Sequence, residues 1–208
     1  MKNITVLNHP VINHHLARLR DKHTDEPEFR MRLDMICKLM VYEITKDLPE
    51  KKVIIETPLE KSEESVLNCN IIVVSILRAG LAMQEAVVQL LPEAKVGHFG
   101  YYRDEETLLP VKYYAKLPEI TNNSVTILCD PMLATGGSLN ASLQLLKNSG
   151  AKTIKCFTLV AAPEGIEAVQ AQHPDVHVIS AALDRRLNEK GYILPGLGDA
   201  GDRQFGTV

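Results

Sequence analysis

The chain has 208 residues, of which 45% are hydrophobic and 24% charged, proportions that exclude a largely disordered protein. Its formal net charge of −3 lacks the basic excess typical of proteins that bind duplex nucleic acid. The longest apolar run, Ile71 to Leu77, is far shorter than the roughly 18 residues that span a bilayer, and the first residues show no signal-peptide pattern. The four cysteines form no paired motif. We therefore expect a cytoplasmic protein with neither nucleic acid nor membrane as partner.

The N-terminal segment, about residues 1–50, is predicted to be helical. From Pro27 to Leu48 the apolar residues recur at spacings of three and four, and Pro49 ends this pattern. A shorter helix is predicted over Val11 to His23.

From residue 51 to 183 buried strands alternate with helices. The run Ile71 to Leu77 is continuous and rich in β-branched residues, as expected of a strand covered on both faces of a parallel sheet. The other predicted strands are 53–55, 96–103, 108–116, 125–129, 153–160 and 176–182, with 96–116 forming a hairpin around an acidic tip at 104–107. The predicted helices are 81–91, 138–148 and 163–172. This order predicts an α/β fold, a mostly parallel twisted sheet flanked by helices.

Residues 184–208 show no regular pattern and are rich in glycine and charge, which indicates a functional loop. We expect one domain over 1–208, made of the helical segment, the core and this C-terminal segment.

The strongest motif follows the strand 125–129. Asp130 comes first, and the run Ala-Thr-Gly-Gly-Ser at 134–138 then opens a helix. Ligands of open α/β sheets bind at the carboxyl ends of strands, and glycines at a helix start let backbone amides converge on an anion. Residues 134–138 are therefore predicted to bind a phosphate monoester through backbone amides and the hydroxyls of Thr135 and Ser138, and Asp130 to accept hydrogen bonds from ribose hydroxyls. The alternative is a tight turn without a ligand, capped by Ser138.

Two better-known phosphate motifs are excluded. No lysine follows Gly137, so the loop is not a Walker P-loop. Residues 196–201 match G-x-G-x-x-G, but the few residues that follow leave no room for the helix and strand of a dinucleotide site.

Two arginines end predicted strands. Arg78 follows the most buried strand, where a guanidinium needs an anionic partner, and Arg103 precedes the acidic tip. Two guanidinium forks at one sheet edge would suit a polyphosphate. The alternatives are an ion pair between Arg78 and a structural acid, and a solvated hairpin position for Arg103.

Three segments together resemble the uracil phosphoribosyltransferases, a branch of the type I phosphoribosyltransferase family that uses phosphoribosyl diphosphate (PRPP). They are Ser-Ile-Leu-Arg-Ala-Gly at 75–80, Cys-Asp-Pro-Met-Leu-Ala-Thr-Gly-Gly-Ser at 129–138 and Tyr-Ile-Leu-Pro-Gly-Leu-Gly-Asp-Ala-Gly-Asp-Arg at 192–203. The resemblance covers essentially the whole chain. It implies the type I fold with N-terminal helices, a β-hairpin arm and a C-terminal base-binding loop.

The resemblance also implies the site. The PRPP-binding residues are Arg78, Arg103, Asp130, Pro131, Met132, Leu133, Ala134, Thr135, Gly136, Gly137, Ser138 and Asp199. The uracil-binding residues are Ile193, Gly198, Asp199 and Ala200. Catalysis is assigned to Arg78 and Arg103, at the pyrophosphate, and to Asp199. In this family the loop at Arg78 often contains a non-proline cis peptide bond.

The implied reaction is uracil + PRPP → UMP + diphosphate, a step of pyrimidine salvage with an oxocarbenium-like transition state. Many relatives outside the uracil branch have a second acid where this chain has Pro131. We therefore expect no direct protein ligand for the Mg²⁺ cofactor, which would arrive bound to PRPP. The resemblance also implies a homodimer or larger assembly, sometimes activated by GTP, and no residue here locates a GTP site. The long N-terminal helix carries apolar residues around much of its circumference, including Met31, Met35 and Tyr42, which favours such an interface.

Two other functions stay open at this point. A non-enzymatic regulator on the same fold would bind nucleotides and RNA, and would want a basic face. A related transferase would act on a purine or on orotate, whose carboxylate would want a cation near Arg203.

Overall fold

The computed structural model describes residues 3–103 and 110–207. Its central sheet has the strand order β1–β10–β9–β7–β4–β5–β6. Every neighbouring pair on this path is parallel except β5 and β6, which form the predicted hairpin at one edge. The strands are β1 (Ile4–Val6), β4 (Asn70–Leu77), β5 (Lys95–Arg103), β6 (Pro110–Lys116), β7 (Ser124–Cys129), β8 (Met132–Leu133, paired with β9), β9 (Thr153–Ala161) and β10 (His177–Leu183).

Successive residues of β4 belong to two separate hydrophobic cores, because side chains alternate between the faces of a strand. Ile71 and Val73 pack into one core, whereas Ile72, Val74 and Ile76 pack into the other. All five are buried, which explains why the sequence of this strand is apolar without alternation.

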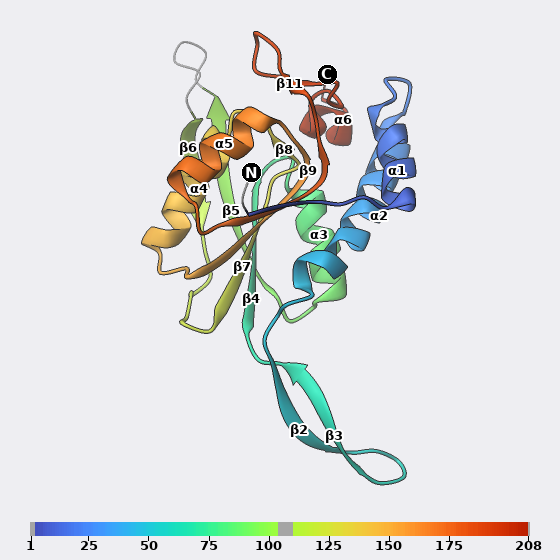
Figure 1. The fold of residues 1–208 in the computed structure, drawn as a ribbon, viewed down its shortest axis with the longest axis vertical. Helices are drawn as coiled ribbons and strands as arrows, with labels where there is room; N and C mark the ends of the chain where they lie inside the picture. The colour runs from blue at the N-terminus through green and yellow to red at the C-terminus, as the bar shows by residue number, and fades with distance from the viewer. Residues whose placement is uncertain (1–2, 104–109, 208) are drawn as a thin grey trace.

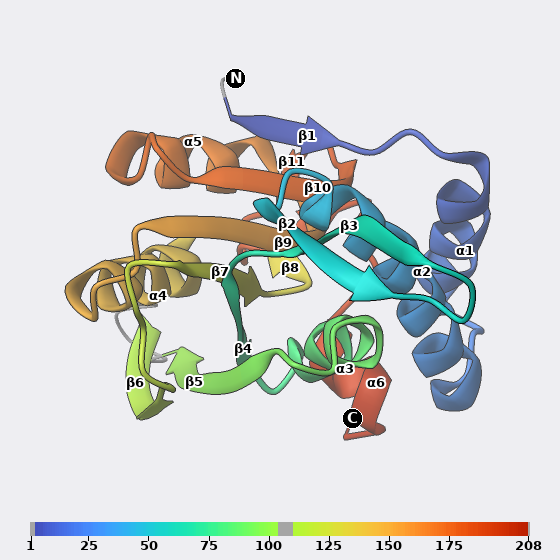
Figure 2. The ribbon, with the colours of Figure 1, turned by 90° about the horizontal axis from the view of Figure 1, so that it is seen from below.

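Helices cover both faces of the sheet (Figure 2). One face carries α1 (Pro10–Arg20), α2 (Glu26–Thr45) and α3 (Leu81–Leu90), and the other carries α4 (Gly137–Asn148) and α5 (Pro163–Gln172). The predicted helices, and the predicted strands other than 53–55, are therefore confirmed, with ends within three residues of those observed. Among the described residues, no helix combines the length and the apolarity needed to cross a bilayer.

The structure corrects the sequence analysis at residues 50–67. The predicted strand 53–55 is the middle of β2 (Glu50–Glu56), which pairs only with β3 (Lys61–Leu67), a strand that we did not predict. Together they form an antiparallel ribbon, the β2–β3 arm, which projects from the body of the molecule (Figure 1). The sequence of β3, Lys-Ser-Glu-Glu-Ser-Val-Leu, has no apolar alternation because most of this ribbon is exposed.

The C-terminal segment is also more regular than we expected. It contains the two short antiparallel strands β11 (Arg186–Leu187) and β12 (Ile193–Leu194), and the helix α6 (Ala200–Phe205). These elements lie at the end of the molecule opposite to the β2–β3 arm (Figure 1). Their strands are too short for periodicity to reveal them.

Candidate active site

The pocket lies at the carboxyl ends of β4 and β7, where the chain departs in opposite directions. The loop after β4 leads to α3 on one face of the sheet, and the loop after β7 leads to α4 on the other, which leaves a crevice between them. The pocket has a volume of about 390 Å³. Its predicted lining residues are Asp130, Met132, Leu133, Ala134, Thr135, Gly136, Gly137, Ser138, Ile193, Gly198, Asp199 and Ala200.

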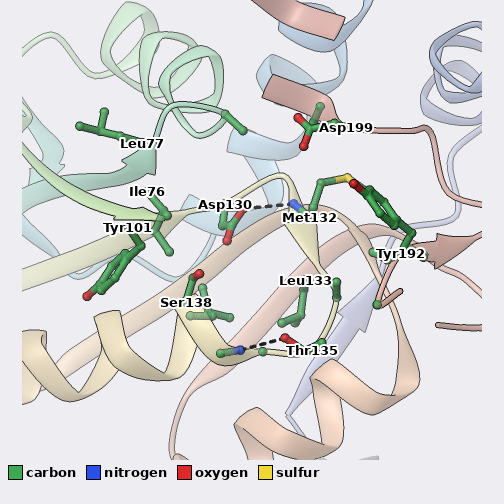
Figure 3. Close-up of a pocket in the computed structure, with 18 of the residues that line it drawn as sticks. Ile76, Leu77, Tyr101, Asp130, Met132, Leu133, Thr135, Ser138, Tyr192 and Asp199 are labelled. Atoms are coloured by element: carbon green, nitrogen blue, oxygen red, sulfur yellow. Dashed lines mark hydrogen bonds between the residues drawn. The ribbon is translucent and has the colours of Figure 1, made fainter. Parts of the chain in front are cut away.

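One wall is the turn that opens α4. Gly136 has a φ of 81°, a left-handed conformation that side chains disfavour, and a Cβ there would lie 3.1 Å from the carbonyl oxygen of Gly165. The Thr135 hydroxyl accepts the Gly137 N–H at 3.5 Å (Figure 3). The first amides of a helix lack intrahelical acceptors, so this wall can bind an anion through the backbone, without a cationic side chain.

Asp130 lines the pocket between the turn that opens α4 and the C-terminal segment that contains Asp199 (Figure 3). Its carboxylate accepts the Met132 N–H at 3.2 Å. Burial, with a smaller contribution from the nearby charge of Asp199, raises the pKa of Asp130 to about 7, although the Met132 N–H opposes this shift. A half-buried carboxylate with spare acceptor capacity suits the hydroxyls of a sugar.

The opposite wall comes from the C-terminal segment. Asp199 is the N-cap of α6 and accepts the Asp202 N–H at 2.9 Å, while its carboxylate faces the pocket near Asp130 (Figure 3). The G-x-G-x-x-G segment at 196–201 is a loop leading into the short helix α6, which we did not predict, and Gly198 lines the pocket.

Arg78 does not line the pocket, although its neighbours Leu77 and Ala79 do. The Leu77–Arg78 peptide bond is cis, as the resemblance implied. The guanidinium donates to Asp202 at 3.1 Å and to Thr207 at 3.3 Å, and it lies 5.7 Å from the centre of the Phe205 ring. In this structure Arg78 therefore forms an ion pair with an acid of α6 at the rim, which was our alternative reading.

Two other predicted residues differ from the rest of the set. Pro131 is buried behind the pocket, and its carbonyl accepts the N–H groups of Leu159 and Val160 at 3.1 and 2.9 Å. Arg103 ends β5 at the same edge of the sheet, but its side chain and the predicted acidic tip at 104–107 lie outside the described residues.

Sequence reasoning missed several lining residues: Ile76, Leu77, Ala79, Tyr101, Leu139, Gly191 and Tyr192. The Tyr192 ring lies beside the Met132 side chain at the mouth of the pocket (Figure 3). Burial raises the pKa of Tyr101, which lies on β5. Both tyrosines adjoin predicted site segments, and proximity to those segments was the one signal available for them.

The donor set bears on the magnesium question. The described residues contain no cluster of three or more His, Cys, Asp or Glu side chains that could hold a metal ion. Asp130 and Asp199 are the two carboxylates of the pocket lining. Such a pair fits a Mg²⁺ ion bound mainly by diphosphate, ribose and water oxygens, not a cage built by the protein.

The start of α4, the half-buried Asp130 and the C-terminal loop meet at one sheet edge, in the arrangement of a type I phosphoribosyltransferase. The fold agrees: the adenine phosphoribosyltransferase of Leishmania donovani superposes with a TM-score of 0.63 at 16% identity, covering 92% of this chain and 88% of that one. A solved protein of Aquifex aeolicus gives a TM-score of 0.94 at 37% identity, covering 99% of both chains.

Sequence comparison narrows the class. Residues 6–207 match the model of the family described as uracil phosphoribosyltransferase. A uracil phosphoribosyltransferase of Clostridioides difficile is 55% identical over 208 residues, and one of Lacticaseibacillus paracasei is 54% identical, each covering 100% of both chains. The chain belongs to the uracil phosphoribosyltransferase family.

Proposed function

We propose that this chain transfers the phosphoribosyl group of PRPP to uracil, giving UMP and diphosphate. The observation that carries the proposal is the convergence, in one pocket, of the 134–138 turn, the half-buried Asp130 and the C-terminal loop at 193–200. A 5′-phosphate, a ribose and a planar base would bind these three parts in that order. Backbone groups of Gly198, Asp199 and Ala200 can match the alternating donors and acceptors of uracil.

The proposed mechanism relies on positioning and on charge. Uracil N1 attacks ribose C1′ as the bond to diphosphate breaks, so positive charge develops on the ribose and negative charge on the leaving group. The carboxylates of Asp130 and Asp199 face the ribose side, and hydrogen bonds from ribose hydroxyls favour the charged form of Asp130. Arg78 and Arg103 are the proposed partners of diphosphate. For Arg78 this requires its guanidinium to exchange Asp202 for the leaving group.

Mg²⁺ is the proposed cofactor, and when bound with PRPP it would neutralise charge on the diphosphate oxygens. Asp130 and Asp199 are the residues that could reach its water shell. Activation by GTP rests on the family resemblance alone, and a rise in rate on adding GTP to the assay would support it.

The test is a base panel. We expect the purified protein, with Mg²⁺ and PRPP, to form nucleotide from uracil and not from orotate, hypoxanthine or adenine. Orotate is disfavoured because Arg203, the cation near the base loop, donates to the carbonyls of Leu19, Leu197 and Asp21 instead of facing the pocket. Formation of no nucleotide from any base would favour the regulator.

Replacing Asp199 with asparagine should lower kcat more than it weakens PRPP binding. Asparagine keeps the cap of α6, since its side-chain oxygen still accepts the Asp202 N–H, but it loses the charge near the ribose and N1. Steady-state kinetics and PRPP binding by calorimetry separate the two effects. Equal losses in both would assign Asp199 to binding alone.

We also propose a homodimer, supported by the β2–β3 arm. Ile54, Ile55 and Leu59 are exposed by 66%, 44% and 96%, so apolar side chains on both faces of this ribbon meet solvent. An isolated two-stranded ribbon is marginally stable in water, which favours a second copy as its cover. Met31, Met35, Leu39 and Tyr42 of α2 are exposed as well.

The double substitution Ile54→Glu and Leu59→Glu should shift sedimentation equilibrium from dimer toward monomer at micromolar concentration. Glu63→Gln, on the same ribbon, is the matched control and should not. A wild-type protein that sediments as a monomer would contradict the dimer.

We propose the cytoplasm as compartment, a choice that four unpaired cysteines support. The proposal treats residues 1–208 as one catalytic domain.

A further inference from the structure

The base-binding loop is tied to α1 by a ring of hydrogen bonds. Arg20, the last residue of α1, forms a two-pronged ion pair with Asp184, with N–O distances of 2.6 and 2.8 Å. The same guanidinium donates to the carbonyl of Gly196 at 2.7 Å. The Gly196 N–H donates in turn to Asp184 at 2.9 Å. The backbone carbonyl and the backbone N–H of Gly196 are therefore both held by the Arg20–Asp184 ion pair.

Gly196 has a backbone conformation and a close contact that a residue with a side chain could not adopt without strain. Its φ of 62° is left-handed, and a Cβ would lie 2.2 Å from the carbonyl oxygen of Ile193. It lies between Ile193 and Gly198, both of which line the pocket. The conformation of this residue thus sets the distance and orientation between the two ends of the proposed base site.

The ion pair is shielded from solvent. The side chain of Asp184 is 6% exposed and that of Arg20 is 22% exposed. A fork-to-carboxylate pair fixes both direction and distance, which a lysine or a single hydrogen bond does not. Arg203 adds a second tie next to it, by donating to the Leu197 carbonyl at 2.8 Å.

We propose that Arg20 and Asp184 are positioning residues for base recognition, which act through Gly196 on the loop 193–200. The inference rests on the proposed function, because it assumes that this loop reads the base with backbone groups. Backbone groups cannot change rotamer to restore a lost contact, and a displacement of about 1 Å in an active site can cost on the order of 100-fold in rate. The phosphate wall at 130–138 belongs to other elements and should keep its geometry.

The experiment compares Arg20→Lys, Arg20→Ala and Asp184→Asn with the wild type in the uracil and PRPP assay. We expect KM for uracil to rise about 10-fold or more in Arg20→Ala and Asp184→Asn, and less in Arg20→Lys. KM for PRPP should change by about twofold or less, because the loop 193–200 shares only Asp199 with the predicted PRPP site. Hydrogen exchange should quicken at residues 184–200 and stay unchanged at 130–138.

The matched control is Asp47→Asn. Asp47 pairs with the buried Lys155 at the amino ends of β7 and β9, away from the pocket. This variant should lower the melting temperature without moving either KM.

Equal shifts in both KM values, or unchanged values with unchanged exchange at 184–200, would overturn the positioning role. If a variant is too unstable to assay, the exchange comparison on Arg20→Lys decides alone. A wild-type protein that forms no UMP would instead overturn the proposed function itself.

Discussion

The Asp130→Asn variant should be more stable than the wild-type protein at pH 8 and yet lose most of its activity. Burial raises the pKa of this carboxyl to about 7, whereas its ordinary value is 3.8. At pH 8 the folded protein must hold a partly buried charge, and an amide of the same shape removes that cost while still accepting the Met132 N–H. The same change removes the acceptor proposed for the ribose hydroxyls and the negative charge beside the oxocarbenium ion, so kcat should fall by about 100-fold or more.

The pH dependence of the stability determines whether Asp130→Asn raises or lowers Tm. Because the folded pKa is the higher one, the folded state binds more protons than the unfolded state between about pH 4 and 7, so the stability of the wild type falls as pH rises through this range. The penalty at pH 8 is on the order of 2–4 kcal/mol, which should appear as a gain of several degrees in Tm for Asp130→Asn. The gain should shrink toward pH 4.

Thermal unfolding of the ligand-free protein at pH 4.5, 6 and 8 is the measurement. Asp47→Asn is the control of opposite sign, since the hydrogen bond from Lys155 lowers the pKa of Asp47 and its contribution is lost as pH falls. A lower Tm for Asp130→Asn at pH 8, or activity within about threefold of wild type, would contradict the assignment.

Replacing Arg103 with alanine should reduce kcat by about 100-fold or more while leaving the fold intact. Arg103 ends β5 at the sheet edge that carries the pocket, and its proposed role is to stabilise the departing diphosphate. A guanidinium that acts on charge developing in the transition state affects kcat more than the binding of uracil.

Two further variants interpret that result. Arg103→Lys keeps the charge but not the two-pronged geometry, so its kcat should lie between those of alanine and wild type. Lys112→Ala on the neighbouring strand β6 removes an exposed cation of the same hairpin and should leave kcat unchanged. Near wild-type turnover in Arg103→Ala, with circular dichroism confirming the fold, would remove Arg103 from the mechanism.

Much of the fold could be predicted because its main elements carry strong local patterns. Apart from Ser75, the strand 71–77 is apolar because both of its faces are buried, and the Ala-Thr-Gly-Gly-Ser turn needs small residues for its left-handed glycine. What could not be predicted depends on surroundings that lie outside each segment. The strand β3 is polar because it faces solvent, and β11 and β12 are too short to show any period.

The same distinction applies to the site. The proposed phosphate wall is local in sequence, so it could be predicted from residues 130–138, at the start of the helix α4. The partner of Arg78 could not, because Asp202 lies far along the chain and meets it only through the placement of α6. The same reason applies to Tyr101, which lies on β5, and to Tyr192, which directly precedes β12. Both line the pocket because tertiary packing brings these segments to it.

The phosphate wall has a consequence for how this protein tolerates mutation. Its proposed donors include main-chain amides at 134–138, which every amino acid except proline supplies. Alanine at Thr135, Gly137 or Ser138 would therefore under-report the importance of this wall, because the main-chain donors remain. Gly136 is the exception, since a Cβ there would lie 3.1 Å from the carbonyl oxygen of Gly165. The binding chemistry of this wall is encoded in the shape of the chain, and insertions, prolines or a β-branched residue at Gly136 should be far more damaging there than changes of polarity.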